Sequence, residues 1–487
     1  MQFTSPLFIF IFLPLMMAAL ALTPARYRRW TILISGVLFY VLANIKTPVS
    51  ILFLAVSATF AYCASYAVYV SRKKPKRTMM FFCVAVCVTM FAALRFCGVW
   101  LEAYDITFLP LGVSVYLLSV ISMTIDISRG DAEPPANFAD ALLYIGFFPV
   151  LIAGPIIKYK DFVRITSEEK MEFSLNNAAN GIVLFAGGFV KRIGVAAIMA
   201  DAYDRIIDNI PSGGELKLGV GLFLVLLMLA NVYYAFSGYS DMGRGMALIM
   251  GIHLEPDFHY PFAACTPTEY LKRFLGSLYS FLDDYFAGPL ENLLNGIASK
   301  KGKRPRAKAV AFLAGATIAL LNAMWFKASL PMLVAFLPLT LLVAAERADL
   351  CGKTGESWIR RNLFTRSCGR FVTIILVSLF WTQLKLRSVG QMIEYFTSLT
   401  VRGSYQSYRL YLTLFNTEYL WVFAAALLLA LPAILDGCGF DWSRGRAGAV
   451  IRTVYCGGLL LFFVFSIIVI MPQYPEYAAE PLKYITF

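Results

Sequence analysis

The segment TPTEYLKRFLGSLYSFLDDYFAGPLENLL, residues 266–294, is polar and amphipathic in a chain that is otherwise strongly apolar. It opens with Thr-Pro-Thr-Glu, which makes Thr266 an N-cap, Pro267 the first helical residue and Glu269 the third, as in a capping box. Apolar residues then recur every three or four positions and predict one buried helical face: Leu271, Phe274, Leu278, Phe281 and Leu282. We therefore expect a helix that lies at the membrane interface or against other helices and does not span the bilayer.

The composition of the whole chain is that of a polytopic membrane protein. Of its 487 residues, 59% are hydrophobic and 15% are charged, whereas soluble domains are nearer half apolar and a quarter charged. Apolar runs of about 20 residues predict an all-α polytopic transmembrane helical bundle with about 11 to 13 spans or re-entrant segments. We expect a single domain over 1–487, with N-terminal spans in 1–130, a core of re-entrant and interfacial helices in 131–345, and C-terminal spans in 346–487.

Two regions depart from simple spans. Residues 139–157 contain Pro149, Gly154 and Pro155, so we expect a bent or re-entrant segment that is lined by protein. Residues 237–300 interrupt the spanning pattern and predict amphipathic, interfacial structure. The other candidate spans are 5–22, 30–45, 48–70, 79–100, 107–125, 181–200, 217–236, 309–326, 329–345, 371–385, 411–434 and 450–471.

The net charge of +13 follows from basic residues in short loops between apolar runs. Such loops favour the cytoplasmic side of a membrane, and this rule places the N-terminus and the C-terminal tail outside the cytoplasm. In a soluble protein the same charge would favour nucleic acid, but its confinement to loops argues against a nucleic-acid partner and indicates membrane lipids. The basic loops are 25–29, 71–77, 299–308, 360–366 and 441–452.

Cysteine and histidine give no sign of a metal site. The nine cysteines include no CxxC pair, and those within apolar runs are interpreted as small buried hydrophobic residues. The chain has two histidines, His253 and His259, too few for a histidine-rich metal site.

Four segments in order resemble the membrane-bound O-acyltransferase family, most closely its bacterial alginate O-acetyltransferase-like branch. They are LPLGVSVYLLSVISMTIDISRG (109–130), NFADALLYIGFFPVLIAGPIIKYKDF (137–162), GFVKRIGVAAIMAD (188–201) and YYAFSGYSDMGRGMALIMGIHLEPDFHYPF (233–262). The resemblance implies a bundle that encloses a tunnel through the bacterial inner (plasma) membrane. It also implies a cytoplasmic acyl thioester donor such as acetyl-CoA, no bound cofactor, and an envelope polysaccharide or a partner acyltransferase outside.

The chain departs from the family where the resemblance implies histidine chemistry. The family has a histidine where this chain has Leu275, and a second in a Trp-His-Gly-Ala pattern where this chain has Phe326. Neither side chain can accept a proton or form an acyl adduct. Two substitutes are candidates: His259, whose alternative role is that of an ordinary loop histidine, and Lys327, whose alternative role is to reach the membrane interface.

Other polar residues favour structural roles. Asp283 and Asp284 are adjacent, so on a helix they point about 100° apart and do not form a facing carboxylate pair; we expect Asp284 to keep an ion pair. Polar residues at family-like positions predict ion pairs that brace the bundle: Lys191, Arg192, Asp241 and Arg244.

Two functions remain open from the sequence. One is O-acyl transfer in the modification of a cell envelope or exopolysaccharide, carried out by a replacement site. The other is a non-catalytic relative, a pseudoenzyme that acts as a scaffold for a partner enzyme or passes an acyl group or lipid through the inherited tunnel.

Overall fold

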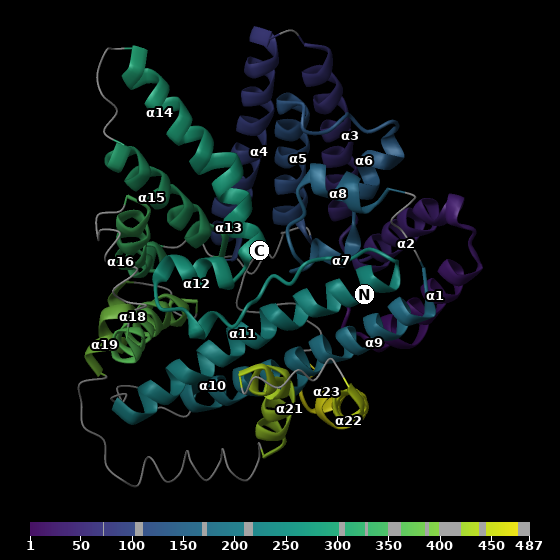
Figure 1. Cartoon of the computed structure of the whole chain (residues 1–487), viewed down its shortest axis with the longest axis vertical. Coiled ribbons are helices and arrows are strands. Elements are labelled where there is room, and N and C mark those ends of the chain that lie inside the picture. Colours follow the sequence, from purple (N-terminus) through teal and green to yellow (C-terminus); the bar gives the residue numbers. More distant parts are fainter. Residues whose placement is uncertain are drawn as a thin grey trace. The chain divides into compact units, whose positions relative to one another are not determined.

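The computed structural model describes residues 1–71, 73–102, 111–167, 173–208, 218–300, 307–326, 330–348, 362–384, 389–398, 420–437 and 445–475. Within these ranges the regular structure is helical, and the one β-bridge joins Phe258 to Phe274. The all-α prediction is therefore confirmed. The helices group into two compact units, which are described separately; Figure 1 shows the helices of both. The expectation of a single domain stays a prediction.

Among the described residues, six helices are long and apolar enough to cross a bilayer. This finding supports the polytopic helical bundle that the composition predicts. The six are Pro48–Val70, Leu175–Ile207, Val220–Ile249, Ala307–Phe326, Phe364–Thr382 and Gly448–Gln473.

The first unit draws on three separate parts of the chain: Met1–Leu22, Glu172–Leu254 and Ser388–Lys483. Its helices are α1 (Leu13–Leu22), α9 (Leu175–Phe189), α10 (Ile198–Asp208), α11 (Leu218–Ile249), α19 (Val389–Ser398), α21 (Leu420–Gly437), α22 (Gly445–Phe465) and α23 (Met471–Gln473). Helix α11 extends to Ile249, so the expected change to interfacial structure at residue 237 is wrong. The small residues between 237 and 249 continue the helix because they pack against α9.

Glycines allow α9 and α11 to lie side by side (Figure 1). A Cβ atom on Gly188 would lie 2.5 Å from the carbonyl oxygen of Gly238, and one on Gly181 would lie 2.6 Å from that of Gly245. The same holds in reverse, since a Cβ on Gly245 would lie 2.6 Å from the Gly181 carbonyl oxygen. The two backbones are thus in direct contact, as small residues permit between membrane helices.

The expected bracing ion pairs are present beside this contact. Asp241 on α11 pairs with Lys191 at 2.5 Å and with Arg244 at 2.9 Å. Arg244 also donates through Nε to the Leu254 carbonyl oxygen at 3.2 Å. The guanidinium of Arg192 lies 5.5 Å from the centre of the Tyr239 ring. The predicted ion pairs are thus confirmed for Lys191, Asp241 and Arg244, and the Lys191–Asp241 pair and the Arg192–Tyr239 contact tie the π-helical segment Val190–Ala197 to α11.

The second unit comprises Thr23–Met171, Glu255–Arg387 and Tyr484–Phe487. Its helices are α2 (Arg28–Ala43), α3 (Pro48–Val70), α4 (Lys73–Glu102), α5 (Val113–Arg129), α6 (Phe138–Ile145), α7 (Phe148–Leu151), α8 (Tyr159–Ile165), α12 (Pro267–Arg273), α13 (Gly276–Leu282), α14 (Gly288–Lys300), α15 (Ala307–Phe326), α16 (Leu330–Arg347) and α18 (Leu363–Thr382). Helices α15 and α16 are adjacent in the chain and pack together (Figure 1).

The bend expected in residues 139–157 is present. Helix α6 ends before Gly146, the short α7 follows, and the chain leaves helical structure after Leu151 until α8 begins. A Cβ atom on Gly146 would lie 2.9 Å from the Leu142 carbonyl oxygen. Glycine is therefore the residue that lets the chain turn sharply at this point.

The start of the opening segment is largely as predicted. The Thr266 side chain accepts a 3.3 Å hydrogen bond from the Glu269 N–H, which confirms Thr266 as the N-cap. The Glu269 carboxylate accepts from the Cys265 N–H at 2.9 Å, one residue before the position that a capping box predicts. The pairing of cap and third residue is thus present in a shifted form.

The prediction of one continuous helix after Thr266 is wrong. Helix α12 ends at Arg273, α13 begins at Gly276, and a π-helical segment, Asp283–Ala287, leads into α14. The apolar residues of the predicted face are nevertheless all buried: Leu271, Phe274, Leu278, Phe281 and Leu282. The periodicity therefore identified the burial correctly, while the interruption depends on contacts from another part of the chain.

Candidate functional site

The interruption between α12 and α13 falls at Phe274 and Leu275. Leu275 has φ 56° and ψ 57°, in the left-handed region, and Phe274 before it is extended, with φ −107° and ψ 108°. A left-handed conformation costs a residue with a Cβ about 1–2 kcal/mol, and it persists only where the surroundings hold it. The first position at which the resemblance implies a histidine is thus a strained break in a helix.

A segment before α12 holds this break in place. The His259 N–H donates to the Arg273 carbonyl oxygen at 2.9 Å, and the Gly276 N–H donates to the Asp257 carbonyl oxygen at 3.1 Å. The Asp257 carboxylate accepts from the Ser277 N–H at 2.7 Å. These bonds satisfy backbone groups on both sides of Leu275, so they fix the course of the chain through the break.

An aromatic cluster fills the interior beside the break. The ring of Phe326 lies 4.7 Å from Trp381 and 6.4 Å from Phe274, and Phe274 lies 5.1 Å from Trp381, between ring centres. The Trp381 indole donates to the Tyr270 hydroxyl at 2.9 Å. Leu275 is 6% exposed and Phe326 is 1% exposed. The fold therefore brings Phe326 next to the residue that precedes Leu275, and both positions are buried in apolar surroundings.

The candidate substitutes have different surroundings. His259 lies along the break, where its backbone is bound to Arg273, but its side chain is exposed. Lys327 lies outside the described residues. His253 belongs to the first unit, in a loop after α11, and its side chain is exposed.

A buried polar network joins Tyr285, in the π-helical segment after α13, to side chains of α5, and it was not predicted from the sequence. The Tyr285 hydroxyl donates to Asp126 at 2.8 Å and is 2.9 Å from the Ser122 hydroxyl. The Ser122 oxygen accepts from the Tyr159 N–H at 2.8 Å, and Asp126 accepts from the Lys160 N–H at 3.0 Å. Burial, followed by the charge of Asp126, raises the pKa of the Tyr285 phenol. Tyr285 therefore stays protonated and acts as a donor.

Two cations flank the ring of Tyr285. The Arg129 guanidinium lies 5.3 Å from the ring centre and the Lys158 ammonium 5.9 Å from it. Lys158 forms an ion pair with Asp284 and donates to the Ser280 hydroxyl at 2.8 Å. The expected ion pair of Asp284 is thus confirmed, and it anchors the π-helical segment to the chain before α8.

The neighbouring carboxylate faces a different partner. Asp283 pairs with Arg347 at 2.8 Å, and Arg347 also pairs with Glu291 at 2.7 Å. Asp283 and Asp284 therefore point to separate partners, as their spacing predicts.

The sequence pattern that could have predicted the buried network lies on α5. There Ser122 and Asp126 are four residues apart and hence on one helical face within an apolar run.

The two regions have opposite chemical character. The cluster around Phe326 offers hydrocarbon and aromatic surface, and neither Leu275 nor Phe326 can transfer a proton. The network of Ser122, Asp126 and Tyr285 contains groups that could transfer one, but all three are at most 4% exposed. Each of those groups also has a hydrogen-bond partner within the network, which is the arrangement of a structural core.

The chain is similar to known membrane acyltransferases. Residues 68–293 match the model of the membrane-bound O-acyltransferase family. The chain is 30% identical over 302 residues to a probable alginate O-acetylase of Azotobacter vinelandii, covering 58% of each chain. It is 25% identical over 331 residues to a peptidoglycan O-acetyltransferase of Helicobacter pylori, covering 59% of this chain and 61% of the relative. It is 24% identical over 181 residues to a teichoic acid D-alanyltransferase of Bacillus subtilis, covering 36% and 44%. The matches thus span less than two thirds of each relative.

Proposed function

We propose that the chain serves in O-acylation of a cell-envelope polymer or exopolysaccharide, because residues 68–293 match the model of the membrane-bound O-acyltransferase family. The names of its relatives support the proposal, since they acetylate alginate or peptidoglycan or transfer D-alanine to teichoic acid. The chain itself is a multi-pass membrane protein. We place it in the inner membrane, with an acyl thioester such as acetyl-CoA as donor on the cytoplasmic side and a hydroxyl as acceptor outside.

The proposal includes a degenerate catalytic position. The observation that carries it is the burial of Leu275 and Phe326 beside the aromatic cluster, where neither side chain can act as a base or carry an acyl group. Proton transfer at a histidine contributes about 10²–10⁴-fold to the rate of such reactions. In this reading the chain supplies the membrane scaffold for a partner acyltransferase or the passage for an acyl group, and the chemistry belongs to the partner.

A replacement site is the second candidate function. Its support is the position of His259, whose backbone is bonded to Arg273, two residues before Leu275. Lys327, next to Phe326 in the sequence, is the other candidate group. Either would have to reach the acceptor hydroxyl within hydrogen-bond distance to act as a general base.

The test is acyl transfer from labelled acetyl-CoA by the full-length protein in lipid nanodiscs, with an envelope polysaccharide as acceptor. The degenerate reading predicts no transfer above background by the unaltered chain. Transfer that is lost in His259→Ala or Lys327→Ala, and kept in the matched control His253→Ala, would overturn that reading and establish the replacement site.

A cellular measurement tests the broader proposal. Deleting the chain from its host should lower the ester-linked acyl content of the envelope or exopolysaccharide, and a Leu275→Gly copy that is made at normal levels should restore it. Unchanged acyl content after the deletion would show that the chain has no part in this modification.

A further inference from the structure

Residues 152–158, which we name the strap, connect α7 to α8 in the second unit without helical structure. The strap contains Gly154 and Pro155, and proline has no backbone N–H to donate. Irregular backbone in a membrane protein persists only where protein or water satisfies its polar groups. The bonds that the strap makes therefore decide which part of it is fixed and which part can move.

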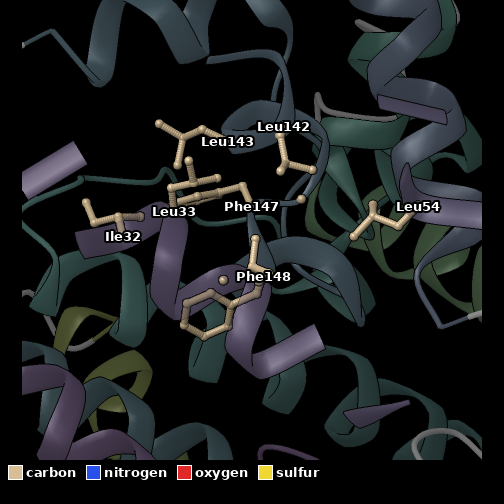
Figure 2. Close-up of a pocket in the computed structure, with 10 residues that line it drawn as sticks. Ile32, Leu33, Leu54, Leu142, Leu143, Phe147 and Phe148 are labelled. Carbon is tan, nitrogen blue, oxygen red and sulfur yellow. The ribbon is translucent and has the colours of Figure 1, made fainter. Parts of the chain in front are cut away.

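Both ends of the strap are anchored. Before it, Phe147 and Phe148 line a small apolar pocket with side chains of α2, α3 and α6 (Figure 2), and the ring centres of Phe148 and Phe39 are 4.9 Å apart. After it, the Tyr159 N–H donates to the Ser122 hydroxyl at 2.8 Å, and Tyr159 is buried. Movement between these anchors is therefore confined to the strap.

Between its anchors, the strap is bonded to one face of α13 and of the π-helical segment that follows. The Ile156 N–H donates to the Ser277 hydroxyl at 2.9 Å. The Lys158 ammonium donates to the Ser280 hydroxyl at 2.8 Å and pairs with the Asp284 carboxylate. The three partners are three and four positions apart, so they lie on one helical face. Each of these bonds ends on a side chain, so the strap can separate without breaking the backbone hydrogen bonds of α13.

The ion pair between Lys158 and Asp284 is the contact most suited to open. The Asp284 side chain is 43% exposed, and ion pairs near solvent contribute little to stability and weaken as salt is added. Arg129 donates to the Asp284 carbonyl oxygen at 2.8 Å, so a second cation stays beside this residue when Lys158 leaves. The Tyr144 hydroxyl of α6 donates to the Ile157 carbonyl oxygen at 2.8 Å. The strap therefore has a bond to α6 that it keeps when its bonds to α13 open.

We propose that the strap is a gate over the start of α13, held shut by the pair of Lys158 and Asp284 and released when that pair opens. The face that it covers begins at Ser277, two residues after Leu275. Opening uncovers the part of α13 next to the break and leaves the buried bond of Tyr159 in place. The gate thus regulates access to the candidate site, and it is inferred from these contacts alone, without reliance on the proposed acylation.

Hydrogen exchange of single backbone amides tests the gate in the full-length protein in lipid nanodiscs. The Ile156 N–H reports opening of the strap, and the N–H groups of Tyr159 and Lys160, which are bonded to the buried network, report the anchor. After correction for intrinsic rates, we expect Ile156 to exchange several-fold faster than the two anchor amides. Asp284→Asn should increase the Ile156 rate further, several-fold, and leave the anchor amides unchanged.

The matched control is the neighbouring carboxylate. Asp283→Asn loses a pair with Arg347 instead, so it should leave the exchange of Ile156 unchanged. Salt gives a second measurement, because screening weakens an exposed ion pair. Raising the salt concentration about tenfold should speed Ile156 exchange in the unaltered protein and have no effect in Asp284→Asn.

Two results would overturn the gate. One is exchange of Ile156 at the same rate as the anchor amides, which would mean that the whole segment opens together. The other is an Ile156 rate that responds neither to Asp284→Asn nor to salt. Melting temperatures in the same nanodiscs show whether each variant is folded. Lys158→Met, which removes the same pair from the side of the strap, replaces Asp284→Asn if that chain does not fold.

Discussion

The Oδ1 atom of Asp257 accepts a 2.7 Å hydrogen bond from the backbone N–H of Ser277, twenty residues later in the chain. Together with the bond from the Gly276 N–H to the Asp257 carbonyl oxygen, it occupies the first donors of α13. Asp257 is 2% exposed, so this cap is buried beside the strained Leu275.

Removing that cap should destabilise the second unit. We expect Asp257→Ala to cost about 1–2 kcal/mol, the range for loss of a helix cap, and to lower the melting temperature in detergent. Asp257→Asn keeps an acceptor oxygen and should cost less. If both variants melt at the same temperature as the unaltered protein, Asp257 does not hold the break.

The strain of the left-handed Leu275 can be measured by comparing a glycine substitution there with one at Leu278 inside α13. Leu275→Gly and Leu278→Gly each remove a buried leucine, but glycine relieves about 1–2 kcal/mol at residue 275 and costs about 1 kcal/mol inside α13. Leu275→Gly should therefore be the more stable of the two variants by about 2–3 kcal/mol. The reverse order in thermal melts would mean that Leu275 is not strained.

The buried network should depend on the phenol of Tyr285. Tyr285→Phe removes the donor to Asp126, and leaving a buried acceptor without that bond costs about 1–3 kcal/mol. The Ser122 hydroxyl contacts the same phenol. A double-mutant cycle of Ser122→Ala and Tyr285→Phe should therefore show a non-additive interaction between residues 122 and 285. The exposed Tyr260 serves as the control, because Tyr260→Phe should leave the melting temperature unchanged. Additive effects of the pair would argue that the two hydroxyls act separately.

The contact between α9 and α11 should tolerate no side chain at its centre. Gly188→Ala would place a Cβ 2.5 Å from the Gly238 carbonyl oxygen, whereas a Cβ on the neighbouring Gly187 would meet only the Leu459 side chain, at 3.6 Å. We expect Gly188→Ala to cost about 1–3 kcal/mol, as overpacking does, and Gly187→Ala to be neutral. Equal melting temperatures for the two variants would contradict direct backbone contact.

A buried amide offers a stabilising change. Asn322 is 2% exposed, and its Nδ2 atom has no hydrogen-bond partner in the part of the chain that the structure describes. An unsatisfied buried donor costs about 1–3 kcal/mol, so Asn322→Leu, of similar shape, should raise the melting temperature. The same substitution at the hydrogen-bonded Gln383 should not. A lower melting temperature for Asn322→Leu would indicate that the amide has a partner.

Local sequence signals predicted much of the fold. Composition and run length identified a helical membrane protein, the cap at Thr266 was visible as a pattern, and periodicity identified buried residues such as Leu278. The break at Leu275 was not visible, because it depends on bonds from Asp257 and His259 rather than on a local breaker residue. Likewise, the extent of α11 beyond residue 236 depends on glycine contacts with α9, which a pattern of polar residues concealed.

The candidate site, too, was predictable from local sequence only in part. Residue identity alone showed that Leu275 and Phe326 lack proton-transfer chemistry, and the resemblance brought both to attention. The network of Ser122, Asp126 and Tyr285 needed the structure, since Tyr285 lies 159 residues from Asp126. Long-range pairing of this kind leaves no local pattern to read.

The first unit takes its helices from the beginning, the middle and the last part of the chain. During synthesis, its early helix must therefore wait in the membrane until α9 and α11 are inserted, and again until α22 arrives, before the unit is complete. Contacts between residues so distant in sequence slow folding, and waiting helices expose surfaces that other membrane proteins could bind. Assembly of this unit is thus completed only after the last of these helices has been inserted.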